Sequence, residues 1–117
     1  MNAPMTANIH TAADLRTLRC SHQTQALDAA EALRLCQLLD GWSMASGKLV
    51  NTFGFNNYHE TMAFVNALAY ISHREDHHPE LVVGYKTCQV RYDTHSVNGL
   101  SINDFICAAK ADALGQA

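Results

Sequence analysis

The sequence predicts an α+β domain in which a four-stranded antiparallel sheet carries three helices on one face. Helical and extended patterns follow one another in the order α-β-β-α-β-β-α, and a short turn separates the two segments of each extended pair. Short turns join strands as antiparallel hairpins. The composition, with 48% apolar and 16% charged residues among 117, is typical of one globular domain. The other face or an edge of the sheet is left open, and we expect a homo-oligomer to cover it.

The first half of the chain predicts one helix and one hairpin. Leucine and alanine recur every three or four residues over 24–39, which predicts a helix. Gly41 follows this segment and can adopt the left-handed conformation that ends a helix. Strands are expected over 42–45 and 49–55, because a Ser-Gly turn signal lies between two runs of strand-forming residues.

The second half repeats this pattern and adds a last helix. Asn57, with a glutamate three residues later, has the form of a helix-capping box. The apolar stripe that follows predicts a helix ending near Asp76, ahead of a proline. An apolar strand is expected over 81–85 and an alternating strand over 87–94. A second capping-box pattern at Ser101 predicts the start of the last helix.

The N-terminal segment, the net charge and the lack of long apolar stretches argue against several classes of protein. Residues 1–22 show little periodicity, so we expect a flexible N-terminal tail followed by a single domain over 23–117. The net charge of -3 and the lack of a basic run argue against direct nucleic-acid binding. No apolar stretch approaches the ~20 residues of a membrane span, and the N-terminus lacks the features of a secretory signal. We therefore expect a cytoplasmic protein without a membrane partner.

The four cysteines do not form a recognisable motif. They are far apart, with no CxxC pair, which argues against a zinc ribbon or a thioredoxin-like redox site. In a reducing compartment they are expected to be free thiols, and three of them lie among apolar neighbours as small core residues do. The cysteines are Cys20, Cys36, Cys88 and Cys107.

Histidines carry the strongest chemical signal. Five of the seven lie in the second half of the chain. The end of the predicted second helix brings His77 and His78 to the rim of the sheet, and the last strand ends at His95. Three imidazoles from two segments can therefore converge on one pocket.

Such a cluster suits the removal of water from a substrate. Imidazole has an unperturbed pKa of about 6.5, so it can give or take a proton near neutral pH. Dehydration needs both actions, because the leaving hydroxyl must be protonated and a neighbouring N–H must lose its proton. General acid–base assistance is typically worth about 10²–10⁴-fold in rate.

Other interpretations of the same residues stay open at the level of sequence. A histidine near a helix end is often only a solvated group favoured by the helix dipole. His73 and His77 have the i, i+4 spacing of zinc ligands, and His95 with Asp104 could complete such a site. No cysteine and no HExxH motif joins them. Asp104 also lies three residues after Ser101, where it would complete a capping box.

Taken together, the motif resembles that of the pterin-4a-carbinolamine dehydratase family. The resemblance covers about residues 24–114 and includes upstream matches at Gly41-Trp42, at Phe53 to Tyr58 and at Phe64. Its core is the spaced set His73, His77, His78, Pro79, Tyr85, His95 and Asp104.

The resemblance implies an activity and a site. Members dehydrate 4a-hydroxytetrahydropterins to quinonoid dihydropterins in tetrahydrobiopterin recycling, without a metal or organic cofactor, and assemble as homo-dimers or homo-tetramers. Some relatives instead act as protein-binding dimerisation or assembly cofactors, which is the alternative function for this chain. His73 departs from the family, because that position is often glutamate. By position, the resemblance implies His77, His78 and His95 as catalytic residues, and Asp76, Pro79, Asp93, Thr94, Ser96, Asp104 and His73 as substrate-binding residues.

Overall fold

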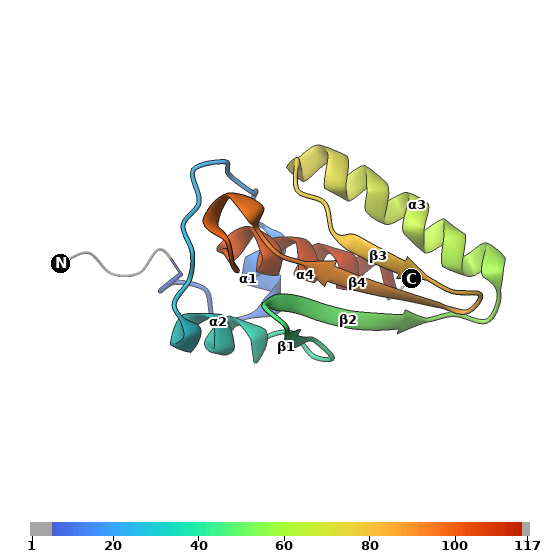
Figure 1. Ribbon diagram of the computed structural model, residues 1–117, viewed down its shortest axis with the longest axis horizontal. Helices are drawn as coiled ribbons and strands as arrows, with labels where there is room; N and C mark the ends of the chain where they lie inside the picture. The colour runs from blue at the N-terminus through green and yellow to red at the C-terminus, as the bar shows by residue number, and fades with distance from the viewer. Residues whose placement is uncertain (1–5, 116–117) are drawn as a thin grey trace.

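Over residues 6–115 the architecture is a four-stranded antiparallel sheet with four helices (Figure 1). The computed structural model describes residues 6–115. The strands lie in the order β1-β2-β4-β3, with every neighbouring pair antiparallel, so the predicted α+β class is confirmed. The elements are α1 (Ala12–Arg16), α2 (Ala29–Cys36), β1 (Ser43–Ala45), β2 (Lys48–Gly54), α3 (Tyr58–Glu75), β3 (Glu80–Val83), β4 (Thr87–Tyr92), the 3-10 turn η1 (His95–Val97) and α4 (Ile102–Gly115).

One face of the sheet forms the core with the helices. The strand β4 alternates as predicted: its side chains Cys88, Val90 and Tyr92 are all fully buried, as is Leu49 on β2. Helix α4 contacts β2, α3 contacts β4, and the two helices contact each other. Figure 1 shows α4 running behind the central strands. Burial of this face fixes the register of β4, because a shift of one residue would expose all three of its apolar side chains.

Helix α3 begins and ends where the sequence predicts. Oδ1 of Asn57 accepts from the N–H of Glu60 at 2.8 Å, which satisfies a free donor of the first turn. Oε1 of Glu60 accepts in return from the N–H of Asn56, the residue before the cap, at 3.0 Å. At the other end Asp76 is left-handed, with φ 51°, so the helix stops before His77. No helix within residues 6–115 combines the length and the apolarity needed to cross a membrane.

The segment before the domain differs from the flexible tail that the sequence predicts. Its helix α1 begins with a capping box between Thr11 and Asp14. Leu15 on this helix is fully buried, and α1 packs on α4. A helix of five residues is too short for an apolar period to show in the sequence. The part of the expected tail at residues 1–5 lies outside the described residues.

Candidate active site

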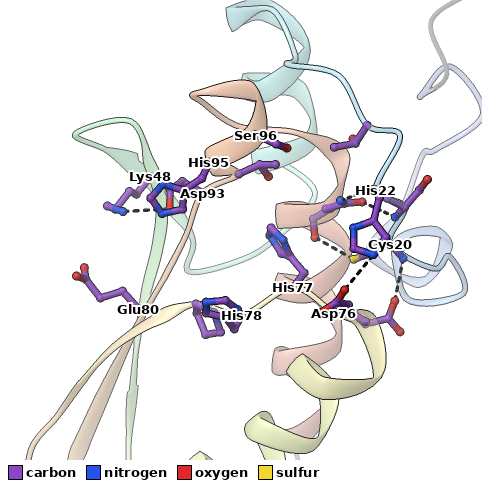
Figure 2. A pocket seen from close by; sticks show the side chains of 16 residues that line it. Cys20, His22, Lys48, Asp76, His77, His78, Glu80, Asp93, His95 and Ser96 are labelled. Atoms are coloured by element: carbon purple, nitrogen blue, oxygen red, sulfur yellow. Dashed lines mark hydrogen bonds and ion pairs between the residues drawn. The ribbon is translucent and has the colours of Figure 1, made fainter.

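A cavity of 510 Å³ opens where the C-terminal end of α3 meets the end of β4. Its volume falls in the range of small-molecule sites, and its walls carry many polar groups. Figure 2 shows His77 between two groups of side chains, with His22 and Asp76 on one side and Asp93 and His95 on the other. The lining residues are Cys20, Ser21, His22, Thr24, Lys48, Glu75, Asp76, His77, His78, Pro79, Glu80, Asp93, Thr94, His95, Ser96 and Asn103.

His77 is anchored from behind by a buried carboxylate. Its Nε2 lies 2.7 Å from Oδ1 of Asp104, and Asp104 is fully buried while the His77 side chain keeps 12% of its surface exposed. A buried carboxylate needs partners for its oxygens, because burial without hydrogen bonds is costly. The pair therefore holds the imidazole at the cavity wall from a site that solvent does not reach.

The second oxygen of Asp104 is satisfied by local structure. Oδ2 accepts from Oγ1 of Thr94 at 2.8 Å and from the backbone N–H of Ser101 at 2.9 Å. The Thr94 and Ser101 hydroxyls also lie 2.8 Å apart. The capping-box prediction for Ser101 and Asp104 thus accounts for one of these contacts, while the other oxygen is left for His77.

Packing fixes the His77 ring as well. The ring is stacked on that of Tyr92, with 5.9 Å between centroids and 10° between planes. Tyr92 is fully buried, and its hydroxyl has no hydrogen-bond partner within residues 6–115. Burial raises the pKa of Tyr92 well above its usual value, so this hydroxyl stays neutral near neutral pH.

His95 enters the cavity from the end of β4. The chain leaves the strand at Asp93, whose Oδ1 lies 3.1 Å from Nζ of Lys48 on β2. Thr94 then pairs with Gly99 across a tight loop. The loop can close because it contains the 3-10 turn η1 and because Asn98 is left-handed, with φ 55°. This loop places His95 and its neighbour Ser96 at the cavity wall.

Most residues expected at the site share this cavity, and two do not line it. His77, His78, Pro79 and His95 line it together with Asp76, Asp93, Thr94 and Ser96. Asp104 lies behind His77. His73 is exposed and is not a lining residue, because it precedes the buried Glu75 by two residues, about 200° around the helix.

Tyr85, which belongs to the spaced set that carries the family resemblance, does not line the cavity. Tyr85 is 65% exposed and is stacked on Tyr58, with 6.0 Å between ring centroids.

Within residues 6–115 no three or more His, Cys, Asp or Glu side chains are grouped as a metal centre requires. The zinc alternative also depended on His73, which does not line the cavity.

Sequence reasoning missed one wall of the cavity. Residues 19–24, called here the N-terminal strap, contribute Cys20, Ser21, His22 and Thr24 to the lining. Cys20, Ser21 and His22 lie in the segment expected to be a tail, and Thr24 lies at the start of the first predicted helix. No local pattern connects these residues to the histidines. A partial signal exists only in Asn103, a polar residue in the apolar stretch that begins the last helix.

Asn103 attaches the strap to α4 through a pair of hydrogen bonds. Its Oδ1 accepts from the N–H of Ser21 at 3.1 Å, and its Nδ2 donates to the carbonyl of Ser21 at 2.8 Å. The amide thus satisfies the backbone of the strap much as a neighbouring strand would. Asn103 is itself buried, so the strap is fixed at this point.

Glu75 attaches the strap to α3. Its Oε1 accepts from the N–H of Cys20 at 2.8 Å, and its Oε2 lies 2.8 Å from Nζ of Lys110 and 3.1 Å from Nε of Arg19. Burial alone would raise the pKa of Glu75, but the hydrogen bonds from Lys110 and Cys20 and the charges of Lys110 and Arg19 lower it below its usual value. The carboxylate is therefore charged and paired at neutral pH.

Comparison with known proteins identifies the family. The profile of the family described as pterin 4 alpha carbinolamine dehydratase matches residues 25–114, which include the histidines and the aspartate behind them. The chain belongs to the pterin 4 alpha carbinolamine dehydratase family. The match begins at residue 25, directly after the N-terminal strap.

Relatives of the pterin carbinolamine dehydratase family align over most of the chain. A protein of Nitrosomonas europaea, provisionally named pterin-4-alpha-carbinolamine dehydratase, is 51% identical over 92% of this chain and 96% of its own length. One of Nitrosospira multiformis with the same provisional name is 53% identical over 88% and 94%.

Two solved structures share the fold. A transcriptional coactivator/pterin dehydratase from Brucella melitensis superposes with a TM-score of 0.75 at 28% identity, over 78% of this chain and 99% of its own. A pterin dehydratase-like protein identified as a RuBisCO assembly factor in the alpha-carboxysome has a TM-score of 0.54 at 26% identity, over 65% and 88%.

Proposed function

We propose that this chain dehydrates a 4a-hydroxytetrahydropterin to the quinonoid dihydropterin and water by histidine acid–base catalysis. The observation that carries the proposal is the position of His77, His78 and His95 around one cavity, with His77 anchored to a buried carboxylate. The reaction breaks the C4a–O bond, the hydroxyl leaves as water after gaining a proton, and N5 loses its proton as the C4a–N5 double bond forms. Both proton transfers are within the chemistry of imidazole.

The contact with Asp104 favours His77 as the base. A carboxylate only accepts hydrogen bonds, so the shared proton lies on Nε2 of His77, and Nδ1 of the neutral ring is free to take a proton. Asp104 also stabilises the imidazolium that results. His95 is then the acid that protonates the hydroxyl, and His78 orients the heterocycle.

The direct test follows the decay of a carbinolamine generated in situ. His77→Ala and His95→Ala are each expected to slow the enzymatic decay at least 100-fold, since each removes one acid–base group. His59→Ala is the matched control, because His59 is exposed on α3 and does not line the cavity. If folded His95→Ala matched the wild-type rate, His95 would have no part in the mechanism. If the wild-type protein did not accelerate the decay, the proposed activity would be wrong.

In this proposal the chain acts in tetrahydrobiopterin recycling as a homo-oligomer. Its product has the oxidation state of a dihydropterin, so a reduction must follow to regenerate the tetrahydropterin. The edge strand β3 exposes Val82 and Val83, by 52% and 41%, and an exposed apolar edge is commonly covered by another copy of the chain. Light scattering of the purified protein tests this part, and a monomer would contradict it.

A second candidate function is binding to another protein in an assembly role. It is favoured by the likeness to the RuBisCO assembly factor and by the exposed apolar residues of β3. A purified chain that binds one partner stoichiometrically while lacking dehydratase activity would support this role over the enzymatic one. Full dehydratase activity in the absence of any partner would favour the enzyme.

A further inference from the structure

The N-terminal strap is a built wall of the cavity. Its backbone is held at Cys20 by Glu75 and at Ser21 by Asn103, and both anchoring side chains are buried. These three hydrogen bonds to buried groups fix the backbone of Cys20 and Ser21. The position of the next residue, His22, is therefore well defined.

His22 approaches the residue that precedes His77. Its Nε2 lies 2.9 Å from Oδ2 of Asp76, and both side chains also line the cavity. Most of each side chain is open to solvent, 82% for His22 and 77% for Asp76. An ion pair this exposed contributes little to stability, so it does not explain how the strap stays in place. The exposed surface of the pair is instead free to contact a ligand.

The chemistry of this wall is that of a hydroxyl-binding surface. The strap contributes Ser21, His22 and Thr24 to the lining, and Asp76 adds a carboxylate. Figure 2 places His22 and Asp76 on the side of His77 away from His95. If a heterocycle reacts between His77 and His95, a substituent on it that points away from His95 extends past His77. That substituent then meets the wall formed by the strap and Asp76.

We propose that the N-terminal strap selects the substituent of the substrate, with His22 and Asp76 binding the hydroxyl groups of a polyhydroxylated side chain. This inference rests on the proposed function, since it takes the substrate to be a pterin. The strap precedes the matched family region, which begins at residue 25, so it adds specificity to a reaction centre that the family residues supply. Asn103 acts as a positioning residue, because it holds the strap and not the ligand.

The test compares two stable ligands that differ only in the side chain at C6. Binding of 7,8-dihydrobiopterin, with its dihydroxypropyl group, and of 6-methyl-7,8-dihydropterin is measured by titration calorimetry on the full chain. The wild type is expected to prefer the hydroxylated ligand. His22→Ala is expected to weaken its binding about tenfold, the size of one or two lost hydrogen bonds, and to leave the methyl ligand within about twofold.

Controls separate the strap from the fold and from the reaction. His59→Ala, on the exposed surface of α3, is expected to change neither affinity, and His22→Gln, which keeps a donor, is expected to retain part of the preference. Asn103→Ala is expected to reproduce the loss of preference, with circular dichroism to verify folding. An equal preference in wild type and folded His22→Ala would overturn the role of the strap. A wild type that binds neither pterin and shows no turnover would overturn the proposed function itself.

Discussion

Replacing Asp104 by asparagine tests how the geometry behind His77 produces a base. The carboxylate accepts three hydrogen bonds, from His77, Thr94 and Ser101. Asparagine has the same shape but only one accepting oxygen. If that oxygen stays with Thr94 and Ser101, the new amide group donates to Nε2 of His77. The ring must then carry its proton on Nδ1, so it can no longer accept a proton there.

The expected effects on stability and on rate differ in size. All three hydrogen bonds can still form in Asp104→Asn, but none of them is strengthened by a negative charge. The free energy of unfolding is therefore expected to fall by roughly 1–3 kcal/mol. Losing the general base is expected to lower kcat about 10²–10⁴-fold, or about 3–5 kcal/mol in the activation barrier. Catalysis should therefore suffer more than folding in Asp104→Asn.

Two measurements and one control decide the outcome. Carbinolamine decay gives kcat, and nitrogen NMR of the His77 ring gives its tautomer. Asp112→Asn is the matched control: this carboxylate on the same helix accepts from Nε1 of Trp42 at 2.9 Å, and burial raises its pKa above the usual value. Removing that charge should leave kcat unchanged and stability equal or higher. A folded Asp104→Asn protein with wild-type kcat, or with the proton still on Nε2, would refute the reasoning.

Three further outcomes are expected. Tyr92→Phe should raise the free energy of unfolding by about 1 kcal/mol, because it removes a buried hydroxyl without a hydrogen-bond partner in the described residues; a loss of stability in urea titration would contradict this. Glu75→Gln should destabilise the protein at pH 7 by roughly 1–2 kcal/mol. Since the folded-state pKa of Glu75 lies below its ordinary 4.5, this difference should persist above pH 4.5 and shrink as pH falls through the lower pKa; a constant difference down to pH 3 would exclude the ionised carboxylate as its source. Iodoacetamide at neutral pH should label Cys20, which lines the cavity, before Cys107, whose pKa is raised by its hydrogen bond with Cys20 and by burial; peptide mapping that found Cys107 labelled first would contradict that order.

Local patterns in the sequence were sufficient for the secondary structure around the site. The alternation of β4, the cap at Asn57 and the stop near Asp76 depend on neighbours within a few residues, and each lies where it was predicted. The order of the elements then allowed few arrangements of the sheet. The spacing of His77, His78 and His95 also carries the family resemblance, which the profile match supports independently.

Only the tertiary structure decided which distant residues meet. Asp104 contacts His77 across 27 residues; its capping-box position alone does not specify which histidine it meets. Asn103 holds Ser21 across 82 residues, so the strap forms a wall of the cavity only in the folded chain. Periodicity is a property of neighbouring residues, whereas a cavity wall is formed by side chains that chain folding brings together, and for that reason one part was predictable and the other was not.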